Sequence, residues 1–479
     1  MVLPKGNIQI TAETKGNYDV IVCGGGTAGC IAALSAARNG AKVLLLEASH
    51  CLGGMATAGN AGLTKYVMHG RDPTAQHRIN KELTTHPEDV QIVGGIPLEI
   101  TEALISAGDA LGNYNTGASY VYPDPHAFKL YLFELLMNAG VSIMLHSHIF
   151  QVIKNGNRIE GVVYMNKEGA FIAYGKYIID STGDGDVAAL SGVEYWIGSS
   201  EHDDTVKDGL TPVGILHAPG SMYRIGGVDF DLILQFFKDH PERFQPHMFG
   251  LMSWEEFVEC YEKGEAIETF CLFSKKSRFQ IYNNPRDGIM VGCISIPTSN
   301  VNCLNADQRT LAEYEVLKTA TEHLEKIKAE IPCFENAFIL DVPPAGIRET
   351  RHIAGEYMLT IRDILTNQYF EDTIGFSSHP IDIYPKPKAC QDIVPPERAW
   401  FRVPYRCLVA KGIDNLLLAG RHISCTREAS GCTRPTVCCM VTGEAVGTAA
   451  ALLSHTGIPA KDIDIQVLRD TLKQNNVKC

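Results

Sequence analysis

One stretch, from residue 18 to residue 47, limits the possible folds of this chain more than any other. It reads YDVIVCGGGTAGCIAALSAARNGAKVLLLE. A short apolar run leads into Gly24-x-Gly26-x-x-Gly29, a small-residue helix pattern follows, and a second apolar run at 42–46 ends in Glu47. A strand, a glycine turn, a helix, a strand and an acid in this order are typical of a dinucleotide-binding βαβ unit.

Each residue of this pattern has a physical role in such a unit. Gly24 permits the tight turn, Gly26 lets a pyrophosphate approach the backbone, and Gly29 lets the helix pack against the strand. The helix that begins at Thr27 and Ala28 offers free N–H groups to phosphate oxygens. Glu47 accepts hydrogen bonds from ribose hydroxyls and repels a 2′-phosphate, so we expect an unphosphorylated adenosine nucleotide. A glycine-rich structural turn is the alternative.

Composition excludes several classes of function. The chain has 479 residues, 45% of them hydrophobic, and a net charge of −13. It carries no long basic run, so we expect neither nucleic acid nor an anionic membrane as a partner. The first residues lack the basic and apolar regions of a secretory signal, and no apolar run suggests a membrane span. We therefore expect a cytoplasmic protein.

Cysteine usage agrees with a reducing compartment. The chain has 15 cysteines, an odd number scattered over its length. One group, Cys425, Cys432, Cys438 and Cys439, lacks the spacing of a common iron–sulfur site. We interpret these four as small buried hydrophobic residues, with a metal or redox role as the alternative, and we expect no metal. Cys51 has no partner five residues later, where Ala56 stands, so a dithiol relay is not indicated.

Secondary-structure patterns predict further α-helices and β-strands after the first βαβ unit. We expect a helix at 126–139, a strand at 141–149, a β-hairpin of 151–154 and 158–166 around an Asn-Gly turn, and a strand at 170–179. After residue 215 the sequence pattern changes. The one clear helix in this region is 310–328, and its apolar residues on one side are Leu311, Tyr314, Leu317, Leu324 and Ile327. A buried strand at 415–421 and a small-residue helix at 436–453 restore the first pattern.

These segments predict a nucleotide domain that a second domain interrupts. We expect a first part at 1–214, a substrate or cap domain at 215–400 and a completing part at 401–479. A single dinucleotide fingerprint is present, so a nicotinamide held in its own Rossmann half is not indicated.

Several motifs resemble one known family. They are GGGTAG at 24–29, GGMATAG at 53–59, DSTGDGDVAALSGV at 180–193, YRIGGVD at 223–229, GIRETRHIAGEY at 346–357, HPIDI at 379–383 and RVPYRCLVAKGIDNLLLAGRHIS at 402–424. With them the chain resembles the FAD-dependent oxidoreductases of the glutathione-reductase fold, within the fumarate-reductase-like set. The resemblance covers most of the chain. It implies FAD, which the fingerprint alone does not distinguish from NAD, held by a Rossmann-like α/β domain that an α+β cap domain interrupts.

The resemblance also implies roles for particular residues. Ile149 falls where adenine is contacted by backbone, and the helix that follows Thr433 and Val437 begins near the pyrimidine end of the flavin, where its dipole stabilises the reduced form. The remaining implied cofactor contacts are Gly24, Gly26, Gly29 and Glu47, then Gly53, Gly54 and Met55, then Thr182, Gly183 and Asp184, and finally Gly420 and Arg421. No histidine or cysteine stands where relatives attach flavin covalently, so we expect non-covalent FAD.

Two positions depart from the family pattern. Arg427 replaces a usual histidine, and Tyr384 replaces another. Arg427 and Arg434 could clamp a carboxylate or another anion, or one could pair with Glu428 and the other with the cofactor.

Other charged residues also offer chemistry. Arg351 and His352 belong, with Arg348 and Glu349, to a charged group that is either catalytic or a structural ion network. His379 is a candidate proton carrier that Asp382 could orient, with an exposed or structurally satisfied histidine as the alternative.

The predicted function is hydride transfer between flavin N5 and a small polar or anionic substrate. Reduction of an activated C=C bond and oxidation of a CH–OH or CH–NH group remain alternatives, and an external carrier must donate or accept electrons. A non-catalytic or RNA-directed flavoprotein is the hypothesis from a different class, against which the net charge argues. The sequence leaves a homo-oligomer open.

Overall fold

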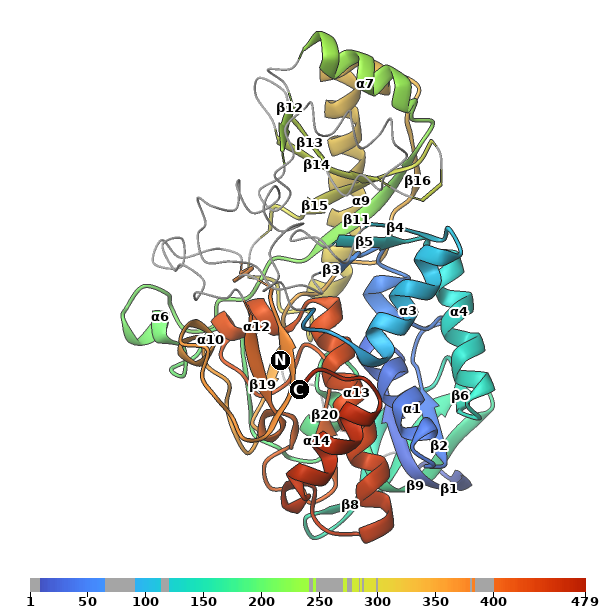
Figure 1. The fold of residues 1–479 in the computed structure, drawn as a ribbon, viewed down its shortest axis with the longest axis vertical. Coiled ribbons are helices and arrows are strands. Elements are labelled where there is room, and N and C mark those ends of the chain that lie inside the picture. The colour runs from blue at the N-terminus through green and yellow to red at the C-terminus, as the bar shows by residue number, and fades with distance from the viewer. Residues whose placement is uncertain are drawn as a thin grey trace.

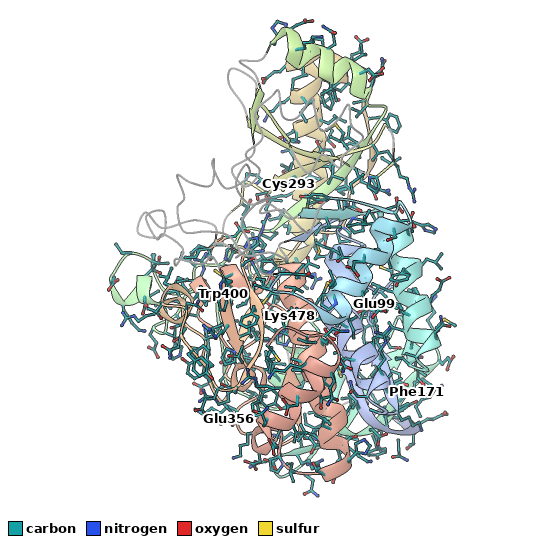
Figure 2. All side chains as sticks on the ribbon, in the orientation of Figure 1. Glu99, Phe171, Cys293, Glu356, Trp400 and Lys478 are labelled. Carbon is teal, nitrogen blue, oxygen red and sulfur yellow. The ribbon has the colours of Figure 1, made fainter. Side chains whose placement is uncertain are left out.

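The structure is a computed structural model, and it describes 9–64, 91–112, 120–240, 244–246, 270–273, 278–283, 285–286, 288–298, 300–379, 381–383 and 400–479. Two bodies are visible in Figure 1: a large one that holds both ends of the described chain, and a smaller one that carries α7 and α9. Cys293 belongs to the smaller body, whereas Glu99, Phe171, Glu356, Trp400 and Lys478 belong to the larger one (Figure 2).

A seven-stranded mixed sheet forms the centre of the larger body. Its strand order is β6-β2-β1-β9-β8-β7, and β20 also pairs with β9. β1, β2, β6, β9 and β20 run parallel, whereas β7, β8 and the start of β9 form an antiparallel meander. The bounds are β1 Ala12–Cys23, β2 Val43–Leu46, β6 Ser142–Met144, β7 His148–Asn155, β8 Arg158–Asn166, β9 Gly169–Asp180 and β20 Leu416–Leu418. The expected strand at 141–149 is therefore wrong as one element, because β6 ends before β7 begins.

Helices and three small sheets complete the larger body. The helices are α1 Thr27–Arg38, α3 Gly95–Ser106, α4 Pro125–Asn138, α5 Asp186–Leu190, α6 Asp204–Lys207, α10 Ile361–Leu365, α12 Arg427–Thr433, α13 Thr436–Thr456 and α14 Ile465–Gln474, with 3-10 turns η1 Gly54–Ala56, η4 Tyr405–Leu408 and η5 Ala460–Asp462. The small sheets are β3 Leu63–Thr64 with β5 Tyr120–Pro123 and β4 Ala110–Gly112, β10 Tyr195–Ile197 with β17 Arg351–Ile353, and β18 Thr373–Ser377 with β19 Phe401–Pro404. The helices expected at 126–139 and 436–453 and the hairpin at 151–166 are confirmed.

Helix α13 is the central helix of the larger body. By length and composition it is the one described helix that could span a membrane, but 89% of its most apolar window is buried inside the protein. Core helices of globular bodies share these properties. Gly443 and Gly447 lie against α1, where an added Cβ would come within 2.3 Å of the carbonyl oxygens of Ala28 and Ala32. The N-terminal nucleotide unit is thus closed by the C-terminal end of the chain.

The smaller body is an antiparallel sheet with α9 packed against it. The strand order is β12-β13-β14-β15-β11-β16. Its strands are β11 Gly220–Gly226, β12 Phe244–Pro246, β13 Phe270–Phe273, β14 Arg278–Asn283, β15 Met290–Ser295 and β16 Phe338–Asp341, and its helices are α7 Phe230–Asp239, α9 Ala306–Glu330 and the 3-10 turn η3 Pro332–Phe334. Asn305 caps α9 by accepting a hydrogen bond from the Gln308 N–H at 3.0 Å.

The buried face of α9 differs from the expected one. Leu324 and Ile327 are buried as expected, but Leu311, Tyr314 and Leu317 are at least half exposed. Ala312, Val316 and Ala320 take their place in the interior. Small and β-branched side chains allow the helix to approach the sheet closely, and this requirement outweighs the hydrophobicity of the larger side chains.

The packing places the limit of the smaller body earlier than residue 400. Buried residues from Tyr223 to Ala337 form their own cluster, whereas Ile353, Leu359 and Ile374 belong to the main core. Gly220 and Gly346 form a two-way backbone bridge where the chain leaves the larger body and returns to it. The limits 1–214, 215–400 and 401–479 stay a prediction, and this packing favours an end of the insertion near 345.

Candidate functional site

The glycine turn after β1 has the geometry that a dinucleotide requires. Gly24 has a φ of 104°, and a Cβ there would lie 2.4 Å from the Ser181 carbonyl oxygen. A Cβ at Gly29 would lie 1.8 Å from the Gly24 carbonyl oxygen. Only glycine fits either position. At Gly26, in contrast, a Cβ would have no atom within 4 Å, so there is open space in front of the turn.

That open space faces the start of α1. No side chain caps this helix at Gly26, so its first N–H groups remain available to an anion. Thr27 donates its hydroxyl to the Gly53 carbonyl at 3.0 Å, and Gly26 and Gly53 form a parallel bridge. Ala28 is buried beneath α13. The segment of Gly53, Gly54 and Met55 therefore runs directly beside the glycine turn.

Glu47 stands at the end of β2 as expected for a ribose ligand. One carboxylate oxygen accepts from the Gly25 N–H at 2.5 Å, and the other accepts from the Ser49 N–H at 2.7 Å. These two bonds fix the carboxylate beside the turn. Each oxygen can accept further bonds, which suits a pair of ribose hydroxyls.

A cavity of about 300 Å³ opens beside Ile149. It is lined by Ile149, Phe150, Asp186, Ala189, Leu190 and Arg351. The segment before Ile149 contacts the backbone of Glu47, because the Ser147 N–H donates to the Glu47 carbonyl at 2.9 Å. The structure thus provides space next to the residue expected to contact adenine.

Arg421 and the loop after β9 form one charged unit. Arg421 donates to the Asp184 carboxylate and, at 2.9 Å, to the Ile347 carbonyl. Burial opposes ionisation of Asp184, but Arg421 and a hydrogen bond from Thr350 together hold its pKa below its ordinary value. Thr182 is hydrogen-bonded to Asp180, and a Cβ at Gly183 would touch the Arg421 guanidinium.

Gly420, Thr433 and Val437 lie around the start of α13. Gly420 donates its N–H to the Thr442 hydroxyl at 3.3 Å, and Thr433 and Val437 are buried. No side chain caps α13, so its first N–H groups can stabilise negative charge. An open phosphate cradle, a fixed ribose acid, an adenine-side cavity and an uncapped second helix together fit FAD. The expected contacts as a set stay a prediction.

Arg427 does not pair with Glu428. It is 1% exposed, and its Nε donates to Glu349 at 3.3 Å. Glu349 also accepts from the His217 N–H and bonds to His352 Nε2, both at 2.8 Å. Glu428 instead accepts from the backbone and side chain of Thr205. The alternative in which one arginine pairs with Glu428 is therefore wrong for Arg427, because Glu428 binds Thr205 of α6.

Arg434 lies at the other end of α12 and binds Asp382. It donates to the Asp382 carboxylate at 2.6 Å and to the Asp382 carbonyl at 2.7 Å. Burial opposes ionisation of Asp382, but Arg434, His379 and Arg348 hold its pKa below the ordinary value. His379 is half-buried and close enough for its charge to act on Asp382. The structure thus brings Arg434, Asp382 and His379 together, while Tyr384 and Pro380 lie outside the described residues.

His217 is a site residue that the sequence did not indicate. It is 1% exposed. Burial lowers its pKa well below the ordinary value, and the charges of Arg434, Arg427 and Arg348 lower it further. The charges of three arginines from two distant segments thus act on one neutral imidazole. No local pattern marks His217, because its neighbours come from residues more than a hundred positions away.

Arg351 and His352 point to different places although they are adjacent on β17. His352 joins the Glu349 network and stacks on Trp196 at 5.8 Å. Arg351 donates to Asp186 at 2.8 Å and lines the cavity beside Ile149. Its catalytic role stays a prediction, and none of its recorded contacts reaches Arg427 or Arg434.

The four clustered cysteines are buried, as expected of small hydrophobic residues. Burial raises the pKa of both Cys425 and Cys439 to about 12. In the described part of the chain, no group of three or more His, Cys, Asp or Glu side chains could hold a metal ion.

The model of the FAD dependent oxidoreductase family matches residues 19–472. A digeranylgeranylglycerophospholipid reductase of Picrophilus torridus is 29% identical over 35% of this chain and 39% of its own length. Digeranylgeranylglycerophospholipid reductase 1 of Methanococcoides burtonii is 28% identical over 45% of this chain and 47% of its own. The matches thus span less than half the length of these curated relatives.

Among solved structures, a geranylgeranyl bacteriochlorophyll reductase-like protein from Thermoplasma acidophilum is similar with a TM-score of 0.47 and 12% identity, over 97% of this chain and 84% of that one. The family match covers nearly the whole chain, and the parallel sheet and the glycine turn fit the cofactor that the family uses. The chain belongs to the FAD dependent oxidoreductase family.

Proposed function

We propose that this FAD-dependent oxidoreductase reduces an activated C=C bond in a small anionic substrate. The single observation that carries the proposal is that the charges of Arg348, Arg427 and Arg434 all act on the buried His217. Guanidinium groups in a region of low dielectric stabilise a carboxylate or a similar anion strongly. FAD, when bound, supplies or accepts a hydride at N5.

Within this cluster Arg434 is the candidate substrate ligand. Arg427 is fully buried and hydrogen-bonded to Glu349, so it contributes to the electrostatic potential of the site rather than exchanging partners. Arg434 is 12% exposed, and its partner Asp382 is 28% exposed. A substrate carboxylate can therefore replace or join Asp382 at the Arg434 guanidinium.

His379 supplies the proton in this proposal. Its charge acts on Asp382, which can orient the ring and stabilise its protonated form. Oxidation of a CH–OH or CH–NH group is the alternative reaction, with His379 as the base. The names of the curated relatives, which are reductases, favour reduction.

The finer features of the account belong to the same proposal. They are a glutathione-reductase-type FAD domain interrupted by an α+β cap, non-covalent FAD, an external electron donor, a cytoplasmic location, and no nucleic acid or membrane partner. A homo-oligomer is compatible with the proposal.

The test is an anaerobic half-reaction. Photoreduced, FAD-loaded enzyme is mixed with α,β-unsaturated carboxylates, with their uncharged amides, and separately with unactivated alkenes, and the flavin absorbance is followed. The proposal predicts rapid reoxidation by the carboxylates alone. Bleaching of the oxidised enzyme by alcohols or amines, with no reoxidation by any alkene, would reverse the proposed direction.

Arg434→Gln provides the residue test. Loss of a charge-assisted hydrogen bond of about 1.5–3 kcal/mol should weaken the binding of the carboxylate substrate roughly 10- to 100-fold, with FAD still bound. Arg38→Gln is the matched control, because Arg38 forms a similar but more exposed pair with Glu99, at 2.6 and 2.8 Å. Equal effects of both variants would remove Arg434 from the substrate site.

A further inference from the structure

The cavity beside Ile149 combines apolar walls with one charged pair. Ile149, Phe150, Ala189 and Leu190 supply the apolar part, and Asp186 and Arg351 supply the charges. Its volume of about 300 Å³ exceeds that of a purine base. An apolar slot with a donor and an acceptor at its wall suits a flat heteroaromatic ring.

The position of Arg351 is fixed from several sides. Its Nη1 donates to the Asp186 carboxylate and to the Asp184 carbonyl, both at 2.8 Å. Its guanidinium carbon lies 5.2 Å from the centre of the Tyr195 ring. Its side chain is 17% exposed. A guanidinium held in this way loses little further entropy when it binds a ligand.

The pair also lies on the adenosine side of the nucleotide site. Arg351 contacts Asp184 in the loop after β9, and its neighbour Thr350 donates to the Asp184 carboxylate at 2.9 Å. Across the cavity, the segment before Ile149 contacts Glu47. By comparison, Arg427 and Arg434 are tied to Glu349 and Asp382.

We propose that Arg351 and Asp186 form the adenine-binding end of the FAD site, and that Arg351 sets the affinity for FAD rather than acting on substrate. Adenine presents an exocyclic amine, which donates to a carboxylate, and ring nitrogens, which accept from a guanidinium. Its π-face also attracts the cation. The inference rests on the use of FAD and not on the substrate proposed above.

The test compares two flavins on apoprotein. FAD and FMN, which lacks the adenosine half, are titrated into the wild type and into Arg351→Gln, with flavin fluorescence as the readout. The expected result is a Kd for FAD that rises about tenfold, the size of a lost cation–π contact and hydrogen bond, with an unchanged Kd for FMN. Arg351→Lys keeps the charge without the planar guanidinium, so its Kd for FAD should lie between those of the wild type and Arg351→Gln.

Arg402→Gln is the matched control. Arg402 also stacks on an aromatic ring, Trp400 at 4.7 Å, and bonds to the Asn367 side chain at 2.7 Å, but it does not line the cavity. It should bind both flavins as the wild type does. An unchanged Kd for FAD in Arg351→Gln, or an equal loss for FAD and FMN, would overturn the inference. A failed substrate test would leave this result unaffected, so the two failures are distinguishable.

Discussion

Asp203 and Glu428 lie together in the interior although 225 positions separate them in the chain. Asp203 accepts from the N–H groups of Ser200 and Arg427, each at 2.6 Å. Burial and the neighbouring Glu428 carboxyl, with which Asp203 shares a hydrogen bond, together raise the pKa of Asp203 from the ordinary 3.8 to about 7, whereas the pKa of Glu428 is lowered despite its burial. The pair therefore holds one proton near neutral pH.

This pair predicts a specific pH dependence of stability. The folded protein holds a proton on Asp203 that the unfolded chain releases near pH 4, so the stabilising contribution is lost as pH rises through about 7. Between pH 6 and pH 8 we expect a loss on the order of 1 kcal/mol in the free energy of unfolding. Urea unfolding of the FAD-loaded protein measures it.

Glu428→Gln should reduce that loss, because it removes the Glu428 contribution to the raised pKa of Asp203 and leaves that of burial. The amide keeps an acceptor for Thr205 and donates to an ionised Asp203, whose pKa then falls. The exposed Glu160→Gln serves as the control and should retain the pH dependence of the wild type. If Glu428→Gln and the wild type lost stability equally, the shared proton would be refuted.

At the scale of elements, α13 organises the nucleotide unit. It packs on α1 through Gly443 and Gly447, and Glu444 between them accepts from the Ile96 N–H at the start of α3, at 3.1 and 3.2 Å. One helix thus fixes the position of two others. The sequence predicted α13 as a small-residue helix but did not predict its partners, because helix contacts depend on the whole fold.

Gly443→Ala tests this contact. Alanine is the better helix former by about 1 kcal/mol, but its Cβ would lie 2.3 Å from the Ala28 carbonyl oxygen. We expect the clash to outweigh the propensity, with a net loss of about 1–3 kcal/mol. Displacement of α1 should also weaken FAD binding. Thermal unfolding and FAD titration measure both effects, and a variant at least as stable as the wild type would contradict the tight contact. Thr456→Ala, at the end of the same helix, is the control.

Other elements mark the limit of prediction from sequence. The fingerprint, the hairpin and α4 follow local patterns, and the structure confirms them. The face of α9 was predicted incorrectly, because Leu311 and Tyr314 follow the helical period as well as Val316 does. The His217 cluster could not be predicted at all, since its members meet through tertiary packing alone.

At the scale of the whole molecule, the smaller body is an insertion with adjacent ends. Gly220 donates to the Gly346 carbonyl at 3.1 Å, and Gly346 donates to the Gly220 carbonyl at 2.6 Å. Most of its buried residues form clusters separate from the main core, and Val291 packs with Tyr122 of β5 in the larger body. The change of sequence pattern near residue 215 predicted the start of this insertion. Its end was harder to predict, because core residues of both bodies alternate in that region of the chain.

Removal of the insertion tests this division. A variant that joins Gly220 to Gly346 through a short Gly-Ser linker should still fold and bind FAD, because the phosphate, ribose and adenine sides of the site all lie outside 221–345. Loss of turnover is the outcome expected of a substrate or cap domain, although Arg434, Asp382 and His379 all lie outside the deleted residues. Flavin content and cooperative thermal unfolding measure the outcome. A deletion variant that neither folds nor binds flavin would show that the two bodies depend on each other.

The central claim, that the N-terminal βαβ unit holds FAD without a covalent bond, is tested most directly by the flavin content of the purified protein. The account predicts one flavin per chain, released by acid precipitation into the supernatant and identified there as FAD by its conversion to FMN with phosphodiesterase. A folded protein that is colourless and takes up no added FAD, or a flavin that remains in the pellet, would contradict it.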